Sequence, residues 1–302
     1  MIKLISRTFG VIVLCLANMV SAQTITSTAT SLITPNGPGG LSGNLCVALQ
    51  PTLSQILGQN IVIEYRPGAN GLIGAQYVAN IKTGKPVLML GSIIADLPMD
   101  QTSDISPVLV VGHAPAFILA RPELGVKTLA ELINRPPKSS ISYGIASGSS
   151  GSFYMKGLSN IVKPKIELVE VPYKSGAAAL ADVLGGHVNV ALVAASAVGS
   201  HVENGNLVVL AVLSTHRSRL APNALTVHEQ GIRFENDIAG FNTQAIWGSP
   251  NIEPDTVKLI RREYAIWAKT PEGQEFYRKN DMQFNPQYIS NPDAVIKQLT
   301  KR

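Results

Sequence analysis

The chain has little cysteine, little tryptophan and few charged residues. Two cysteines and two tryptophans occur in 302 residues, while charged residues make up 15% and hydrophobic residues 45%. That hydrophobic content excludes an intrinsically disordered chain, and the lack of a Gly-X-Y or charged heptad repeat excludes collagen and a coiled coil. The formal charge of +5 is spread out, with no basic run longer than Arg261-Arg262 or Lys301-Arg302. Nucleic-acid binding usually needs a concentrated basic face, so no nucleic-acid partner is expected.

Long apolar runs are also missing, except near the N-terminus. Lys3 and Arg7 precede an apolar stretch over Phe9–Val20, and small residues follow up to Ala22. This order is typical of a secretory signal peptide, so residues 1–22 are predicted to be removed after Ala22 and the remaining chain to be periplasmic. The alternative is a retained membrane anchor, for which the apolar run is short.

Cleavage at this point would leave one cysteine. Cys15 would be removed and Cys46 would stand alone, so no internal disulfide can form. The fold must then be held by its hydrophobic core, and about 280 residues are ample for one. At roughly 100–200 residues per domain, this length predicts two domains.

Short apolar strands alternate with helices along the chain. A predicted helix over 45–57 places Leu45, Leu49 and Leu53 on one face, and Pro51 is expected to kink it. Near-continuous apolar strands between helices indicate an α/β fold with buried, mostly parallel sheets flanked by helices. Thr128 and Thr226 each begin a capping-box pattern. No linker is evident, so the chain is expected to pass between domains within strands, near Ala120 and again near Ser214.

Three glycine-rich loops each follow a predicted strand and open a predicted helix. They span 34–42, 67–74 and 146–152. Glycine lets the backbone approach a ligand closely, and a helix N-terminus carries roughly half a positive charge together with free N–H groups. In open α/β sheets, ligands lie beyond the carboxyl ends of the strands, where such loops gather. Tight turning explains any single loop, but the three together predict an anion site that uses no Arg or Lys.

Catalytic and cofactor motifs are weak by comparison. The second loop reads G-x-x-G-x-x-G instead of the dinucleotide-binding G-x-G-x-x-G, and Asp96 follows the next strand too late for a ribose ligand. Ser149 and Ser150 lie outside any G-x-S-x-G elbow, and no H-E-x-x-H or C-x-x-C motif is present. No catalytic residue, metal or cofactor is therefore expected, and a hydrolase or dehydrogenase remains the less favoured class.

Two longer motifs carry a family resemblance. Residues 62–75 read V-I-E-Y-R-P-G-A-N-G-L-I-G-A and resemble the V-E-N-R-P-G-A-G-G-x-I-G-A signature of the tripartite tricarboxylate transporter receptors, also called Bug-type solute receptors. Residues 171–188 read V-P-Y-K-S-G-A-A-A-L-A-D-V-L-G-G-H-V and are similar to the V-P-Y-K-G…L-x-D-L-L-G-G-x-V block of the same family. Further matches at 205–211, 226–231 and 249–254 extend the likeness over nearly the whole mature chain.

This resemblance implies a type II periplasmic binding protein, a clamshell of two α/β domains. We expect domain 1 to comprise 23–119 plus 215–302 and domain 2 to comprise 120–214. Such receptors capture a small carboxylate in the cleft between the domains and deliver it to membrane subunits of a tripartite tricarboxylate transporter. The chain is expected to act as a monomer.

Departures from the family pattern bear on the ligand. Gly43 stands where the family usually has Asp, Val193-Ala194-Ala195 stands at the place of a second Asp that can pair with a ligand amine, and Phe153 replaces a His. An amino-acid ligand is therefore less expected than a more apolar or aromatic carboxylate. The alternative function is that of a ligand sensor for a membrane signalling receptor.

The candidate ligand-binding residues come from the three loops and from two later segments. They are Asn36, Gly39, Gly40 and Ser42 from the first loop, Ala69, Asn70 and Gly71 from the second, Ser147, Gly148, Ser149, Ser150 and Ser152 from the third, and Lys174, Ser175 and Ser196 as weaker candidates. Arg66 is expected to hold the second loop in place and not to touch the ligand.

Overall fold

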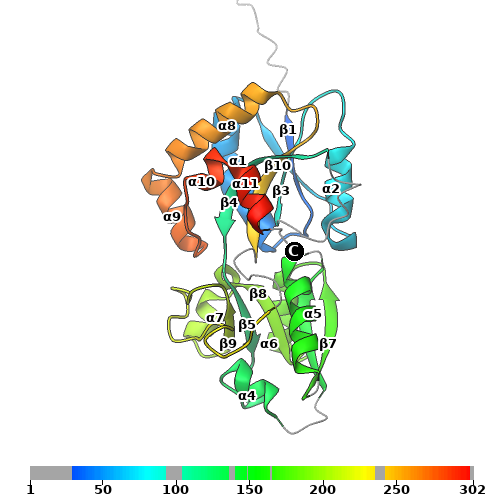
Figure 1. Cartoon of the computed structure of the whole chain (residues 1–302), viewed down its shortest axis with the longest axis vertical. Coiled ribbons are helices and arrows are strands. Elements are labelled where there is room, and N and C mark those ends of the chain that lie inside the picture. The colour runs from blue at the N-terminus through cyan, green and yellow to red at the C-terminus, as the bar shows by residue number, and fades with distance from the viewer. Residues whose placement is uncertain are drawn as a thin grey trace, which may run out of the picture.

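The computed structural model describes residues 29–92, 104–135, 140–147, 149–163, 165–234 and 242–299. The predicted signal peptide and Asp96 lie outside these ranges. The described residues form two lobes stacked along the long axis of the molecule, each built on a five-stranded sheet (Figure 1). The predicted α/β architecture with two domains is confirmed.

The first sheet joins strands from both ends of the described chain. Its strand order is β2 (Ile61–Tyr65), β1 (Thr30–Thr34), β3 (Leu88–Ser92), β10 (Thr243–Gly248) and β4 (Ser106–His113). Strand β1 is parallel to β2 and β3, whereas β10 is antiparallel to β3 and β4. The sheet is mixed because β10 returns from the other lobe in the opposite direction.

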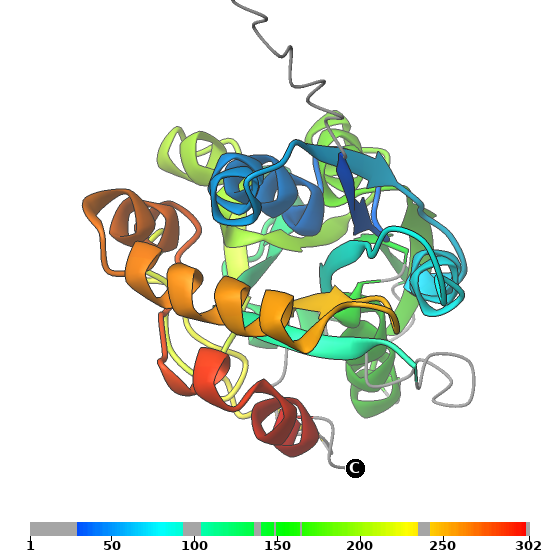
Figure 2. The same cartoon turned by 90° about the horizontal axis from the view of Figure 1, so that it is seen from above.

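Alternate residues of these strands face two separate cores. Leu32 and Leu90 pack with α1 (Leu41–Leu57) and α8 (Pro254–Trp267), whereas Ile33 packs with α2 (Leu72–Ala79). Successive strand residues point to opposite faces, so the sheet forms a layer between helices. Figure 2 shows α1 and α8 on one side and α2 on the other. The lobe is completed by α9 (Pro271–Lys279), α10 (Gln287–Ser290) and α11 (Pro292–Leu299).

The second sheet repeats this plan. Its strand order is β7 (Glu167–Tyr173), β6 (Ser140–Ala146), β8 (Val190–Ala194), β5 (Ala116–Ala120) and β9 (Val208–Leu213). Strand β6 is parallel to β7 and β8, and β5 is antiparallel to β8 and β9. Ile118 faces the core that holds α4 (Leu129–Ile133) and α5 (Ser150–Val162). Phe117 faces the core that holds α6 (Gly176–Gly185), and α7 (Gly199–Glu203) follows β8.

The chain passes between the sheets at points that differ from those predicted. The first lies before Ala120, because only Ala114-Pro115 separates β4 in one sheet from β5 in the other. The second lies after Ser214: Val227 and Ile232, 0% and 6% exposed, pack in the core of the second lobe. The chain rejoins the first sheet only at β10. The first passage lies within a nearly continuous apolar stretch, so the sequence does not reveal where one strand ends and the next begins. The position of the second passage depends on how the segment after Ser214 packs in three dimensions.

Both capping boxes form, but only one opens a helix. Before α4, the N–H of Glu131 donates to Thr128 Oγ1 over 3.1 Å, and the Glu131 carboxylate accepts from the N–H of Lys127 over 2.7 Å. In the Thr226 box, the N–H of Glu229 donates to Thr226 Oγ1 over 3.1 Å and the Glu229 carboxylate accepts from the N–H of Thr226 itself over 2.8 Å, yet a turn follows. The carboxylate of Glu229 also accepts from Arg217 Nε over 2.9 Å. The second box therefore secures a loop instead of a helix.

Helix α1 begins earlier than the sequence predicts. It starts at Leu41 instead of Leu45, after Gly40 in an extended conformation, and it includes Pro51. Cys46 on this helix is a free, buried cysteine, and burial raises the pKa of its thiol to about 12. The thiol is therefore protonated at neutral pH and packs as a small apolar side chain.

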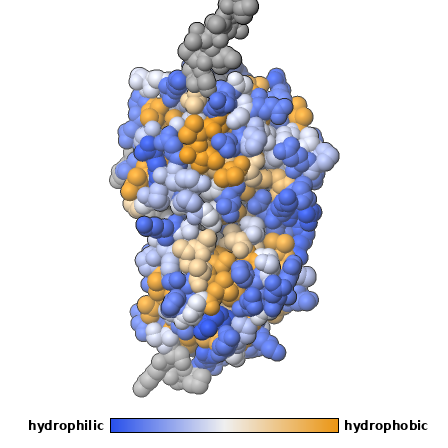
Figure 3. All heavy atoms as spheres, turned by 180° about the vertical axis from the view of Figure 1, so that it is seen from behind, coloured by the Kyte–Doolittle hydropathy of each residue, from blue (hydrophilic) through white to orange (hydrophobic). Residues whose placement is uncertain are grey.

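The surface is mostly hydrophilic, with separate apolar areas on both lobes in the face seen in Figure 3. Exposed large hydrophobic residues include Val47, Val62, Ile73 and Ile266, at 48–58% exposure. Single apolar residues at a surface are normal and need no partner. None of the helices in the ranges described above is both long and apolar enough to cross a bilayer.

His113 lies at the end of β4, beside the passage between the lobes. Its Nδ1 atom is 2.5 Å from Thr243 Oγ1 on β10, and its ring meets the edge of Tyr288 on α10 at 5.3 Å between centroids. Burial, together with a smaller effect of the nearby His216, lowers the pKa of His113 to about 4. The imidazole is therefore neutral in the folded protein at neutral pH.

Acidification is expected to destabilise the fold through His113. Between pH 6.5 and about 4 the unfolded chain binds a proton at this residue and the folded chain does not, so stability falls as the pH falls through this window. In urea unfolding at pH 7 and pH 4.5, His113→Gln should lose roughly 2–3 kcal/mol less than wild type. The exposed His187→Gln is the matched control and should lose as much as wild type. Equal losses in wild type and His113→Gln would contradict the buried neutral imidazole.

Candidate functional site

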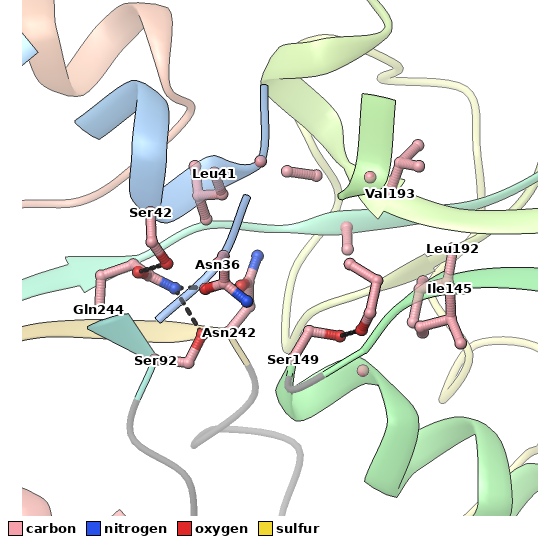
Figure 4. Close-up of a pocket in the computed structure, with 16 residues that line it drawn as sticks. Asn36, Leu41, Ser42, Ser92, Ile145, Ser149, Leu192, Val193, Asn242 and Gln244 are labelled. Atoms are coloured by element: carbon pink, nitrogen blue, oxygen red, sulfur yellow. Dashed lines mark hydrogen bonds between the residues drawn. The ribbon is translucent and has the colours of Figure 1, made fainter. Parts of the chain in front are cut away.

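A hollow that is partly open to solvent lies between the two lobes. Both lobes contribute to the 16 residues that line it (Figure 4). From the first lobe these are Asn36, Gly40, Leu41, Ser42, Ser92, Asn242 and Gln244. From the second they are Ala116, Ile145, Ala146, Ser149, Gly151, Gly176, Leu192, Val193 and Ala194. None of these lining residues carries a charged side chain.

A buried hydrogen-bond network organises the wall formed by the first lobe. Gln244 on β10 is 0% exposed, and its Oε1 accepts from Ser42 Oγ over 2.8 Å. Its Nε2 donates to Ser92 Oγ over 2.9 Å and to Asn242 Oδ1 over 3.3 Å (Figure 4). A hydroxyl group can accept and donate at once. Ser92 accepts from Gln244, so its own hydrogen remains available to a ligand.

Asn36 supplies a second available donor. It follows β1, it is 7% exposed, and Figure 4 shows its amide among the residues that face the hollow. No hydrogen-bond partner for its side chain is found among the residues that the structure describes. An amide that faces the hollow can donate two hydrogen bonds, so the group is suited to a ligand that accepts them.

Three helices begin at the hollow. The first residues of α1 line it together with Gly40, Ser149 and Gly151 bring the start of α5, and Gly176 is the first residue of α6. Neither α1 nor α5 has a side-chain cap, since Gly40 has no side chain and Ser149 Oγ donates to the carbonyl of Ala146 over 2.7 Å. The positive ends of three helix dipoles therefore point at an uncharged hollow, which favours an anion.

Three alkyl side chains of the second lobe lie beside the hollow and pack against two of these helices. Ile145, Leu192 and Val193 are 1%, 4% and 3% exposed. A Cβ atom on Gly151 would lie 2.8 Å from both Ile145 Cδ1 and Leu192 Cδ2, and one on Gly176 would lie 3.6 Å from Val193 Cγ1. These side chains therefore lie against the first turns of α5 and α6, and glycine at 151 is needed for that close approach.

Part of the predicted site is brought together. Asn36, Gly40 and Ser42 from the first loop and Ser149 from the third line the hollow. Gly39, with a φ of +76°, does not, and a Cβ there would meet Ala177 Cβ at 3.0 Å. Three further candidates fall outside this lining: Ser147, Ser152 and Ser196. Gly148 and the side chain of Ser150 lie outside the described residues.

The second loop contributes no residue to the described lining of the hollow. Ala69, Asn70 and Gly71 form a short 3-10 helix, in which Ala69 and Gly71 are not lining residues and the side chain of Asn70 lies outside the described residues. The loop acts as a support: Cβ atoms on Gly74 and Gly91 would lie 3.1 and 2.9 Å from Pro35, so both glycines admit the proline before Asn36. A direct contact of this loop with the ligand stays a prediction, because the family motif identifies the loop and not the direction in which it faces.

Arg66 holds the second loop, as expected. Its guanidinium pairs with Glu64 over 2.8 Å and lies 3.6 Å above the ring of Tyr77. It is not among the residues that line the hollow.

Lys174 and Ser175 are not among the residues that line the hollow, and Lys174 contacts the first lobe. The N–H of Gly37 in the first lobe donates to the carbonyl of Lys174 in the second over 3.3 Å. Ser175 caps α6 by accepting from the N–H of Ala178 over 3.3 Å. A Cβ on Gly37 would lie 2.8 Å from the Lys174 oxygen, so this contact requires glycine.

A second contact links the lobes outside the lining of the hollow. The carboxylate of Asp281, 4% exposed, accepts from Ser218 Oγ over 2.5 Å and from Arg219 Nε over 2.8 Å. Asp281 follows α9 in the first lobe, whereas Leu220 and Ala221 pack in the second. The lobes are therefore tied at two separate places.

Several lining residues are missed by the sequence analysis. Ser92, Asn242 and Gln244 belong to no glycine-rich loop, and Leu192 and Ile145 read as ordinary core residues. The one signal available is polar residues at 242–244 within a stretch otherwise predicted as a buried strand. Buried polar side chains need hydrogen-bond partners, so these residues indicate that the strand faces other polar groups or a ligand.

The chain is similar in sequence to known proteins. The family described as "Tripartite tricarboxylate transporter family receptor" matches residues 46–297. Protein BugT of Bordetella pertussis is 30% identical over 230 residues, which cover 72% of this chain and 70% of that protein.

Solved structures share the fold. The structure of Rpa4515 of R. palustris with adipate has a TM-score of 0.76 at 22% identity and covers 90% of this chain and 94% of that one. MatC of Rhodopseudomonas palustris with bound malate has a TM-score of 0.71 at 18% identity and covers 91% and 99%.

The buried network predicts a measurable cost for losing Ser42. In Ser42→Ala, Oε1 of the fully buried Gln244 loses its donor. The free energy of unfolding should fall by about 1–3 kcal/mol in urea titrations. Ser200→Ala, at an exposed position on α7, is the matched control and should change stability by less than about 0.5 kcal/mol. Equal stability of the two variants would show that the network does not hold Gln244.

Proposed function

Because the chain belongs to the tripartite tricarboxylate transporter receptor family, we propose that it captures a small organic carboxylate in the cleft between its lobes. The observation that carries this proposal is an uncharged hollow at which three helix N-termini and two available donors, on Asn36 and Ser92, converge. Amides and hydroxyls in this lining bind an anion without supplying an ionisable group for catalysis.

A carboxylate suits the donors on the first lobe. Its oxygens can accept from the Asn36 amide, from the Ser92 hydroxyl and from N–H groups in the first turn of α1. Hydrogen bonds to a charged group are worth about 1.5–3 kcal/mol each. Several such bonds can hold the ligand without a buried counter-ion, and the dipoles of α5 and α6 add to the attraction.

Capture is coupled to closure of the lobes. Sheet membership and core packing support a division into 29–114 plus 242–299 and 115–234, in place of the expected boundaries at 119/120 and 214/215. A ligand in the hollow touches both units only when they are closed, so it stabilises the closed arrangement. The contact of Gly37 with Lys174 belongs to this closed arrangement.

The setting follows from the predicted signal peptide. We propose that cleavage after Ala22 releases the mature chain into the periplasm, where it acts as a monomer. There it delivers the carboxylate to the membrane subunits of a tripartite tricarboxylate transporter.

A carboxylate that binds should stabilise the protein. At a ligand concentration of 100 times the dissociation constant, unfolding should cost about 2.7 kcal/mol more than in the free protein. A thermal-shift screen of mono-, di- and tricarboxylates measures this rise, with the corresponding amides and alcohols as uncharged controls. If no carboxylate raises the melting temperature, the proposed function is wrong.

Asn36→Asp tests the donor on the first lobe. The substitution keeps the shape of the side chain but replaces a donor with a carboxylate that repels the ligand. Affinity for the best carboxylate in the screen should fall at least about tenfold by isothermal titration calorimetry. Asn223→Asp, which adds the same charge at an exposed loop position, should bind as wild type does. Unchanged affinity in Asn36→Asp would remove this residue from the site.

Gly37→Ala tests the coupling of binding to closure. The added methyl group would lie 2.8 Å from the Lys174 carbonyl oxygen, so the lobes cannot close without a shift. Affinity should fall about tenfold although residue 37 does not line the hollow. Gly199→Ala, with no atom within 4 Å of its added Cβ, is the control. Wild-type affinity in both variants would separate binding from this contact.

A further inference from the structure

The hydrogen bonds around Gln244 run in one direction, and a backbone carbonyl sets that direction. The carbonyl oxygen of Ala114 can only accept, so the side-chain nitrogen of Asn242 donates to it over 2.9 Å. The oxygen of the same Asn242 amide then accepts from Gln244 Nε2 over 3.3 Å. Gln244 is therefore fixed with its nitrogen toward Ser92 and its oxygen toward Ser42, as Figure 4 shows.

The two serines at the ends of the Gln244 amide are left with opposite capacities, and both line the hollow. Ser92 Oγ accepts from Gln244 Nε2 over 2.9 Å, so its hydrogen remains available to an acceptor on a ligand. Ser42 Oγ donates its hydrogen to Gln244 Oε1 over 2.8 Å, so toward a ligand it can only accept. Turning this hydroxyl toward a ligand would leave the oxygen of the fully buried Gln244 without a donor, which is unfavourable.

The main chain of Ser42 adds a donor beside this acceptor. Ser42 is the second residue of α1, and the N–H of Asn44 makes the first bond of the helix, to the carbonyl of Gly40 over 2.9 Å. The N–H of Ser42 precedes that bond and so has no partner within the helix. A single residue at the hollow therefore offers a ligand both a donor, its N–H, and an acceptor, its hydroxyl oxygen.

A plain carboxylate matches only half of this pair. Its oxygens can accept from the N–H of Ser42 and from the Ser92 hydroxyl, but a carboxylate has no hydrogen to donate to Ser42 Oγ. A hydroxyl group on the carbon next to the carboxylate supplies that hydrogen. Its oxygen is separated from the carboxylate oxygens by as many covalent bonds as separate Oγ from the nitrogen in a serine residue. The two pairs can therefore meet side by side.

We infer that the ligand is a 2-hydroxycarboxylate, whose carboxylate accepts from Ser92 and the start of α1 and whose hydroxyl donates to Ser42 Oγ. This inference rests on the proposed function and names the ligand class within it. Ser42 is then a specificity-determining residue, and Gln244 is a positioning residue that acts through Ser42. The hydroxyl is recognised whatever body the acid carries.

Pairs of acids that differ by one hydroxyl group test the inference in the wild-type protein. Isothermal titration calorimetry compares lactate with propanoate, malate with succinate, citrate with tricarballylate, and 3-phenyllactate with 3-phenylpropanoate, with the enantiomers of each chiral acid titrated separately. In the best-binding pair, one form of the hydroxy acid should bind at least about tenfold more tightly than its partner.

The outcomes separate the inference from the proposed function. Equal or weaker binding of the hydroxy acid would overturn the inference and leave the proposed function standing. So would a lack of binding by all eight acids when another carboxylate raises the melting temperature in the thermal-shift screen. If no carboxylate binds at all, both are wrong.

Ser42→Ala and Ser92→Ala divide the two roles. Ser42→Ala removes the acceptor, so the preference for the hydroxy acid should fall below about twofold. Ser92→Ala removes the donor at the other end of the same amide, so it should weaken both acids of the pair at least about threefold and keep their ratio. Circular dichroism verifies that both variants are folded. A preference that persists in Ser42→Ala, or that is lost in Ser92→Ala, would show that Ser42 does not recognise the hydroxyl.

Discussion

The side-chain amide of Gln244 is held at both ends, by the hydroxyl of Ser42 and by Ser92 and Asn242. This arrangement matters because the hollow has no charged lining residue and must attract an anion with fixed dipoles. Dipoles that are oriented before the ligand arrives need little reorganisation when it binds. The network directs the hydrogen of Ser92 away from Gln244 and leaves the start of α1 open beside it. The electrostatics of the cleft therefore depend on Gln244, a buried residue whose amide oxygen and nitrogen are both hydrogen-bonded.

Each lobe holds only half of this arrangement. Asn36, Ser92 and the start of α1 lie on the first lobe, and the starts of α5 and α6 lie on the second, so a ligand meets both groups only when the lobes are together. Glycine at 37 allows the backbones of the two lobes to meet, and the buried carboxylate of Asp281 ties them at a second place. The contacts that recognise the ligand are therefore also the contacts that favour the closed arrangement of the lobes.

Much of the fold could be predicted because it depends on local patterns. Apolar strands between helices indicated the α/β layers, and glycine before a helix indicated the first and third loops, which reach the hollow through Asn36, Gly40, Ser42 and Ser149. The second loop has the same local pattern, yet it supports Pro35 from behind. Local sequence shows that a loop can approach a ligand, but it contains no information about the side of the sheet on which the loop ends.

The sequence by itself determined the alternation of strands and helices, the uncharged character of the glycine-rich loops and the likeness to a receptor family, since each of these is written in neighbouring residues. Only the tertiary structure decided that β10 brings Asn242 and Gln244 beside Ser42, that α6 supplies the third helix end, and that the segment up to Phe234 belongs to the second lobe. These contacts join residues up to 202 positions apart. Their partners are chosen by packing in three dimensions, which no local periodicity records.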